Sequence, residues 1–132
     1  MNSKIGHIYL YVSDLQKSEG FYKEFLEILG YREIVNEDWG CDFKKDDTSI
    51  WLEQAPEEYV KDGYHRKRVG LNHLAFRVDS REDVDIFSEK FLKKNNIDTL
   101  YDTPKLFPEY SDNYYAVFFE DPDRIKLEVT YY

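Results

Sequence analysis

The sequence predicts an α+β fold built from two tandem βαβββ modules. The first observation is a repeated phrase, because Gly6-His-Ile-Tyr-Leu-Tyr-Val12 and Asn72-His-Leu-Ala-Phe-Arg-Val78 carry a histidine at the same place. The second is a matched pair of segments ending in glutamate, Ile50-Trp-Leu-Glu53 and Ile125-Lys-Leu-Glu128. The third is that both halves repeat one order of strand and helix patterns. We expect one domain over 1–132, with a first module over about 3–54, a connector over 55–69 and a second module over about 70–132.

The first half begins with a strand over 5–12, where β-forming residues alternate in polarity. Asp14 is a suitable N-cap for the helix that follows, and Gly30 is expected to end that helix. Three short strand patterns complete the module, near 31–36, 40–45 and 48–54.

The second half repeats this order. A strand is expected over 71–79, and Ser80 is a suitable cap for a helix that runs to about Asn95. Strands follow near 97–102, 113–120 and 125–131. The segments 55–69 and 103–112 are predicted to be irregular, the first as a connector or lid that contains His65-Arg-Lys-Arg68. Surface loops of this kind are usually solvated.

Composition excludes several classes of partner. The net charge of −9 argues against binding to nucleic-acid phosphates and to an anionic membrane surface. No apolar run approaches the roughly 20 residues that a membrane-spanning helix needs. Cys41 is the single cysteine, so an internal disulfide is excluded. The N-terminus enters a strand pattern at once, without the features of a signal peptide. These observations predict a cytoplasmic protein.

Strand periodicity places four potential metal ligands on equivalent faces. Successive side chains of a strand point to opposite faces, and on each strand the apolar alternates are expected to pack under the helices. The opposite, polar faces carry His7, Glu53, His73 and Glu128. Two imidazoles and two carboxylates suit one divalent ion of the Zn, Ni, Co, Mn or Fe kind. The alternative is that each is a solvent-exposed polar residue on an open sheet.

The same faces carry further residues that could line a pocket. An aromatic content of 17% predicts a ring-rich interior or cavity. Two cations beside the candidate ligands suggest an anionic substrate, although they could equally pair with surface carboxylates. The candidate substrate-binding residues are Tyr9, Tyr11, Trp51, Arg77 and Lys126.

These motifs resemble the vicinal oxygen chelate superfamily, which includes glyoxalase I, bleomycin-resistance proteins and extradiol dioxygenases. The matching segments are Gly6 to Leu15 with Phe21-Tyr22, Gly70 to Val78, and Phe118-Phe-Glu-Asp-Pro-Asp123 ahead of Lys126-Leu-Glu128. The resemblance implies a curved, cup-shaped mixed sheet with the helices on its outer face. It also implies that His7, Glu53, His73 and Glu128 hold the metal ion, and that the protein forms a homodimer.

The implied function is that of a glyoxalase-like lyase or isomerase acting on a small substrate with vicinal oxygens through an enediolate-type intermediate. Glu128 and Glu53 are the candidate catalytic bases, with Glu128 favoured because the corresponding glutamate occurs in every branch of the family. The alternatives are a fosfomycin-type thiol transferase, an extradiol dioxygenase and a non-catalytic binding protein. The substrate could be anionic or a thiol adduct. Tyr11 replaces an arginine that helps bacterial glyoxalase I to hold glutathione, which weakens the case for glutathione itself.

Overall fold

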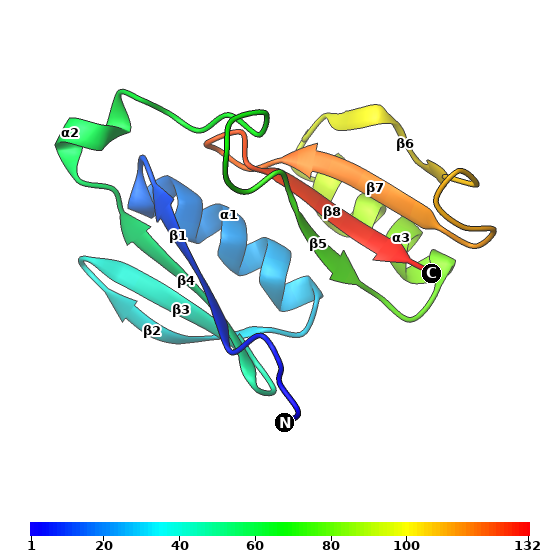
Figure 1. Ribbon diagram of the computed structural model, residues 1–132, viewed down its shortest axis with the longest axis horizontal. Helices are drawn as coiled ribbons and strands as arrows, with labels where there is room; N and C mark the ends of the chain where they lie inside the picture. The colour runs from blue at the N-terminus through cyan, green and yellow to red at the C-terminus, as the bar shows by residue number, and fades with distance from the viewer. The chain divides into compact units, whose positions relative to one another are not determined.

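The computed structural model describes residues 1–132 and divides into two compact units, residues 1–63 and 64–132. Each unit contains one four-stranded mixed sheet with a helix (Figure 1). The fold class predicted from the sequence, α+β with two βαβββ modules, is confirmed. None of the helices combines the length and the apolar character that crossing a bilayer requires.

The first unit follows the predicted order of elements closely. Its strands are arranged β1-β4-β3-β2, with β1 parallel to β4 and the other neighbours antiparallel. The strands span β1 His7–Val12, β2 Arg32–Glu37, β3 Gly40–Lys45 and β4 Thr48–Gln54, and the helix α1 spans Leu15–Ile28.

The boundaries of α1 are those that the capping residues predict. The Asp14 side chain accepts a 3.0 Å hydrogen bond from the backbone N–H of Lys17, which satisfies one free donor of the first turn. Gly30 follows the last turn with φ +86°, a left-handed conformation that favours glycine. Tyr22, Phe25 and Leu26 on α1 are fully buried. The helix is therefore fixed by its caps and by one apolar face.

The second unit repeats the arrangement as β5-β8-β7-β6, with β5 parallel to β8. Ser80 caps the helix as predicted, because its hydroxyl accepts a 3.1 Å hydrogen bond from the backbone N–H of Asp83. The helix then continues as a π-helical segment. The elements span β5 Leu74–Arg77, α3 Arg81–Phe87, η1 Ser88–Lys93, β6 Thr99–Leu106, β7 Tyr115–Glu120 and β8 Lys126–Tyr131.

Two boundaries in the second unit differ from the sequence-based expectation. Strand β5 is shorter than 71–79, and β6 extends through residues 103–106, which were expected to be irregular. The pairing of β6 with β7 shifts register between Leu100 and Lys105. Within this bulge the Thr103 hydroxyl donates to the carbonyl of Leu100 and accepts from the backbone N–H of Phe118. These two hydrogen bonds replace backbone pairing at the bulge, so β6 continues past it. Side-chain periodicity does not predict such a bulge.

The predicted connector contains a short helix, α2, over Glu57–Val60. The boundary between the compact units falls after Gly63, so residues 64–69 belong to the second unit. The segment His65-Arg-Lys-Arg68 is therefore part of the second unit's own structure.

Candidate functional site

The two faces of the first sheet differ as periodicity predicts, whereas in the second sheet the residues of β8 are buried on both faces. On β1 the alternates Leu10 and Val12 are buried, whereas Tyr9 and Tyr11 are exposed. On β4 Ile50 and Leu52 are buried among the core residues. Polar and aromatic side chains therefore occupy the face of the first sheet opposite its apolar core.

In the second unit His73 and Glu128 meet. Nε2 of His73 lies 3.0 Å from Oε2 of Glu128, whose side chain is only 1% exposed. Oε2 has no hydrogen-bond partner, so the short contact does not have hydrogen-bond geometry. A buried carboxylate oxygen without a donor is costly unless a cation compensates it. Nε2 of His73 and Oε2 of Glu128 thus lie side by side, and a cation bound to both would compensate the carboxylate.

Tyr114 holds the other oxygen of Glu128. Its hydroxyl donates a 2.6 Å hydrogen bond to Oε1. Burial, together with this hydrogen bond to the carboxylate, raises the pKa of Tyr114 to about 12. The phenol therefore stays protonated and remains a donor at neutral pH, and the orientation of the carboxylate is set from one side.

Asn72 orients the ring of His73. Its Oδ1 lies 2.7 Å from Nδ1 of His73, and its Nδ2 donates to the backbone carbonyl of Arg66 at 3.3 Å. Because the amide N–H₂ group faces a carbonyl, the amide oxygen must face the imidazole and accept from Nδ1–H. That tautomer leaves the Nε2 lone pair directed to the side where Glu128 lies.

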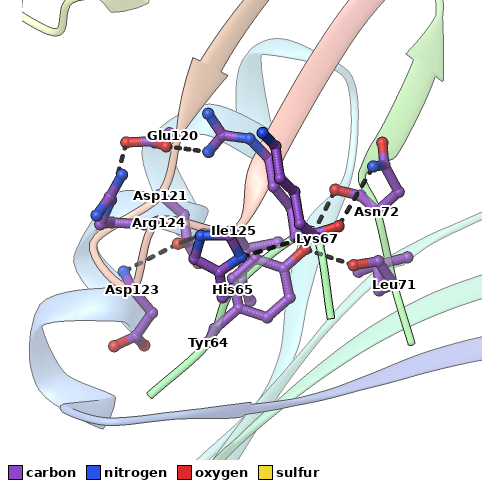
Figure 2. Close-up of polar contacts among 11 residues, drawn as sticks. Tyr64, His65, Lys67, Leu71, Asn72, Glu120, Asp121, Asp123, Arg124 and Ile125 are labelled. Atoms are coloured by element: carbon purple, nitrogen blue, oxygen red, sulfur yellow. Dashed lines mark hydrogen bonds and ion pairs between the residues drawn. The ribbon is translucent and has the colours of Figure 1, made fainter. Parts of the chain in front are cut away.

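Figure 2 shows how the segment around Asn72 is held. The Tyr64 hydroxyl donates to the carbonyl of Leu71 at 2.6 Å and also lies 3.1 Å from the carbonyl of Asn72. Arg66 forms an ion pair with Glu120 at the end of β7. The segment over residues 65–68 is thus attached to the β7–β8 hairpin of its own unit through Arg66. The Arg66 carbonyl in turn positions Asn72, the residue before His73.

A cavity of about 540 Å³ opens beside the His73–Glu128 pair. Its polar lining consists of these two side chains and Lys126. The remaining walls are aromatic and are formed by Tyr101, Phe107, Tyr110, Tyr114 and Phe118. A cavity with apolar walls and a few convergent polar groups is typical of small-molecule sites.

In the first unit the candidate ligand Glu53 also accepts a hydrogen bond from a tyrosine hydroxyl. Tyr9 donates a short hydrogen bond to Oε2 of Glu53, and this bond raises the pKa of Tyr9 to about 12. The Tyr9 ring stacks on Trp51 at a centroid separation of 6.0 Å, and Trp51 stacks in turn on Trp39 at 5.9 Å. Each unit therefore pairs one candidate glutamate with a tyrosine hydroxyl and aromatic rings.

His7 lies at the start of β1 and is paired in register with Ser49. Asp42, which is 2% exposed, accepts a 3.1 Å hydrogen bond from the Ser49 hydroxyl. Burial raises the pKa of Asp42, and the hydrogen bond from Ser49, then the charge of Lys44 and last that of His7, oppose the rise. A carboxylate near an imidazole is a common outer partner of a metal-binding histidine. Strand alternation could have predicted this role for Asp42, because it places Asp42 on the face opposite the apolar residues Cys41 and Phe43.

The structure brings some predicted residues together and not others. His73, Glu128 and Lys126 share one cavity, and Tyr9, Trp51 and Glu53 share contacts on the first sheet. No group of three or more His, Cys, Asp or Glu side chains is gathered closely enough to hold a metal ion.

The remaining two predicted substrate-binding residues, Arg77 and Tyr11, also have aromatic neighbours. Arg77 donates a hydrogen bond to the backbone carbonyl of Tyr132, and its guanidinium lies 4.5 Å from the centroid of the Tyr132 ring. Its charged group therefore already interacts with Tyr132. The Tyr11 ring is tilted against Tyr9 at 6.2 Å. Sequence reasoning did not single out Tyr114 or Asn72; the only signal for Asn72 was its position next to His73.

The comparisons with known proteins identify the family. Residues 4–129 match the model of the glyoxalase/bleomycin resistance protein/dioxygenase superfamily. The chain belongs to this superfamily, as its motifs predicted.

Individual relatives agree with this assignment. The chain is 46% identical to the uncharacterised protein YqjT of Bacillus subtilis over 93% of this chain and 94% of that one. It is 37% identical to a candidate glyoxalase from Bacillus halodurans whose crystal structure superposes with a TM-score of 0.88, covering 97% and 95% of the two chains. The lactoylglutathione lyase of Agrobacterium tumefaciens has a TM-score of 0.70 over 98% and 94% of the chains, and at 21% identity the likeness concerns the fold alone.

Proposed function

We propose that the protein is a glyoxalase-like, metal-dependent lyase or isomerase that acts on a small substrate with two adjacent oxygens. The observation that supports this most is the state of Glu128. Its carboxylate is buried, Tyr114 holds one oxygen, and the other faces Nε2 of His73 at 3.0 Å without a hydrogen bond.

The spacing of these two atoms suits a shared cation. Two adjacent donors of an octahedral ion, each at about 2.1 Å with about 90° between them, lie about 3.0 Å apart. The donor set of imidazole and carboxylate fits Zn, Ni, Co, Mn or Fe. Residues of this chain therefore fit a divalent metal, with His73 and Glu128 as one half of its ligands.

We propose His7 and Glu53 as the other half. Both lie on the polar face of the first sheet, and Glu53 is held by a tyrosine hydroxyl as Glu128 is. The two halves would come from one chain or from two chains of a homodimer. Light scattering at micromolar concentration tests the dimer, and a monomeric mass would contradict it.

The chemistry follows from the groups around the cavity. When bound, the ion would supply Lewis-acid polarisation of a substrate carbonyl oxygen. Glu128 would accept and return a proton at Oε2 while that oxygen is released from the ion, because Tyr114 holds the other oxygen. The aromatic walls would exclude water and hold the substrate's apolar part. Glu53 would remain a ligand.

The experiment is elemental analysis of protein prepared without a metal-binding tag, followed by calorimetric titration of the stripped protein with Zn²⁺, Ni²⁺, Co²⁺ and Mn²⁺. We expect about one equivalent per chain, because each chain carries one set of two histidines and two glutamates, which leaves an open position for the substrate. His73→Ala and Glu128→Gln should lower affinity sharply. His65→Ala is the matched control, because His65 is exposed and accepts only a local bond from the backbone N–H of Lys67.

A protein that binds no metal, or one in which His65→Ala weakens binding as much as His73→Ala, would overturn the proposal. The aromatic cavity would then support the competing function, a non-catalytic protein that binds a small aromatic molecule. Iron as the resident metal, with oxygen-dependent activity, would instead favour the dioxygenase.

A further inference from the structure

Lys126 has an unusual environment for a lysine. It is 9% exposed, and its ammonium group lies 5.7 Å from the ring centroid of Tyr101 and 5.4 Å from that of Phe118. Ring faces attract a cation, but more weakly than a carboxylate does. No carboxylate forms an ion pair with Lys126, so its charge is only partly compensated.

The carboxylates on the same face are already engaged. Glu120 lies directly opposite Lys126 in the β7–β8 register, yet it pairs with Arg66. It also pairs with Arg124 at 3.5 Å (Figure 2). Glu128, two residues along β8, is held by Tyr114 and faces His73. Glu120 is thus neutralised by two arginines, and Glu128 forms no ion pair with Lys126.

We infer that the cavity takes a small, planar, largely apolar molecule that carries one carboxylate, and that this carboxylate pairs with Lys126. Five aromatic side chains wall the cavity, so a flat body finds ring surfaces to pack against. Burying a cation without a partner is unfavourable, and a bound anion removes that cost. The inference rests on the proposed function, because the same cavity contains His73 and Glu128 and would hold the substrate beside them.

The charge balance favours a carboxylate over a phosphate. One ammonium group balances one negative charge, and the charge of Glu128 on the same strand face would oppose a second. The cavity volume of about 540 Å³ lies within the range of roughly 300–1,000 Å³ for small-molecule sites. A bicyclic aromatic acid is therefore a suitable probe.

The test compares 2-naphthoate with its neutral analogue 2-naphthamide by calorimetry on metal-stripped protein in EDTA. We expect naphthoate to bind at least about tenfold more tightly, the effect of one charge-assisted contact. Naphthyl phosphate should not bind more tightly than naphthoate. Equal binding of naphthoate and naphthamide, or a clear preference for the phosphate, would overturn the inference.

Three variants assign the preference to Lys126. Lys126→Met keeps the apolar stem but removes the charge, and it should abolish the preference for naphthoate. Lys126→Arg keeps the charge and should retain the preference, which shows that a substituted site still folds. Lys105→Met is the matched control, since Lys105 also lies over a ring, that of Phe107 at 5.4 Å, but is exposed and outside the cavity lining. A preference that survives in Lys126→Met, or is lost in Lys105→Met, contradicts the inference.

The outcome is separable from that of the proposed function. Metal binding without a naphthoate preference refutes this inference alone. A Lys126-dependent preference in a protein that binds no metal supports this inference and refutes the metal-dependent function.

Discussion

The hydroxyl of Tyr114 donates a 2.6 Å hydrogen bond to Oε1 of Glu128, although Tyr114 lies just before β7 and Glu128 lies in the middle of β8. This bond uses one carboxylate oxygen and leaves the other facing His73. The raised pKa of the phenol, about 12, keeps it a donor at neutral pH. Tyr114 is therefore a positioning residue for Glu128.

Tyr114→Phe should lower metal affinity by about 10–100-fold, because outer partners of metal ligands typically contribute that much. Tyr115→Phe is the matched control, since the Tyr115 hydroxyl donates to Asp85 at 2.8 Å rather than to a candidate ligand. Titration calorimetry with Ni²⁺ or Zn²⁺ measures both. Similar affinities for the two variants would contradict the positioning role.

Asn72→Ala should release His73 from its Nδ1–H tautomer and also weaken metal binding. Asn72→Asp keeps an acceptor at the same place and should preserve the tautomer. Long-range ¹⁵N–¹H NMR of the stripped protein reports the tautomer without any metal or substrate. Finding His73 as the Nε2–H tautomer in the unmutated protein would refute the role given to Asn72.

Glu128→Gln should abolish turnover more completely than it lowers metal content, because it removes both a charged ligand and the proposed proton carrier. Glu53→Gln should be milder, since it keeps a ligand oxygen and removes no proton carrier. The comparison measures turnover and bound metal for both variants, on a substrate found by screening α-ketoaldehyde–thiol adducts and acyl-CoA epimers. An active Glu128→Gln beside an inactive Glu53→Gln would reverse the two roles.

Turnover of the glutathione–methylglyoxal adduct should be poor, because Tyr11 stands where bacterial glyoxalase I carries a glutathione-binding arginine. A charge-assisted contact of that kind contributes roughly 1.5–3 kcal/mol, or about tenfold or more in affinity. Tyr11→Arg should lower KM for the adduct, whereas Tyr59→Arg, an equally exposed control outside the sheet, should not. Efficient turnover by the unmutated protein would show that other residues bind glutathione.

Cys41 should be unreactive in the folded protein. It is 1% exposed, and burial first, then the charges of Glu19 and Glu33, raise the pKa of its thiol from 9.0 to about 12. A thiol reagent at pH 8 should label it only after unfolding in guanidinium chloride. Rapid labelling of the native protein would contradict this burial.

The same shift predicts a pH dependence of stability. Between about pH 9 and pH 12 the unfolded chain loses the Cys41 proton while the folded chain retains it, so this group makes the free energy of unfolding fall as pH rises. Below pH 9 its contribution is fully present. Urea titrations at several pH values should show a shallower decline for Cys41→Ala than for the unmutated protein. Identical declines would refute the assignment.

The sequence by itself determined the order of the elements and the two faces of the sheets. Asp14 and Ser80 cap their helices as predicted, and Gly30 closes the first one. These features depend on residues within a few positions of one another, so local hydrogen bonding and periodicity suffice to predict them. Alternation likewise placed His7 and Glu53 on the polar face of the first sheet, and it placed Glu128 on the polar face of the second.

Only the tertiary structure decided what surrounds the candidate ligands. The pairing of Tyr114 with Glu128, the bond from Asn72 to the carbonyl of Arg66, and the bulge at Thr103 depend on strand register and loop path. Lys126 looked equally suited to a surface salt bridge. Its environment depends on Glu120, its partner on the neighbouring strand, which pairs instead with Arg66, 54 residues before Glu120 in the sequence. Contacts between residues so distant in sequence leave no periodic signal, because they are set by how the loops fold back onto the sheet.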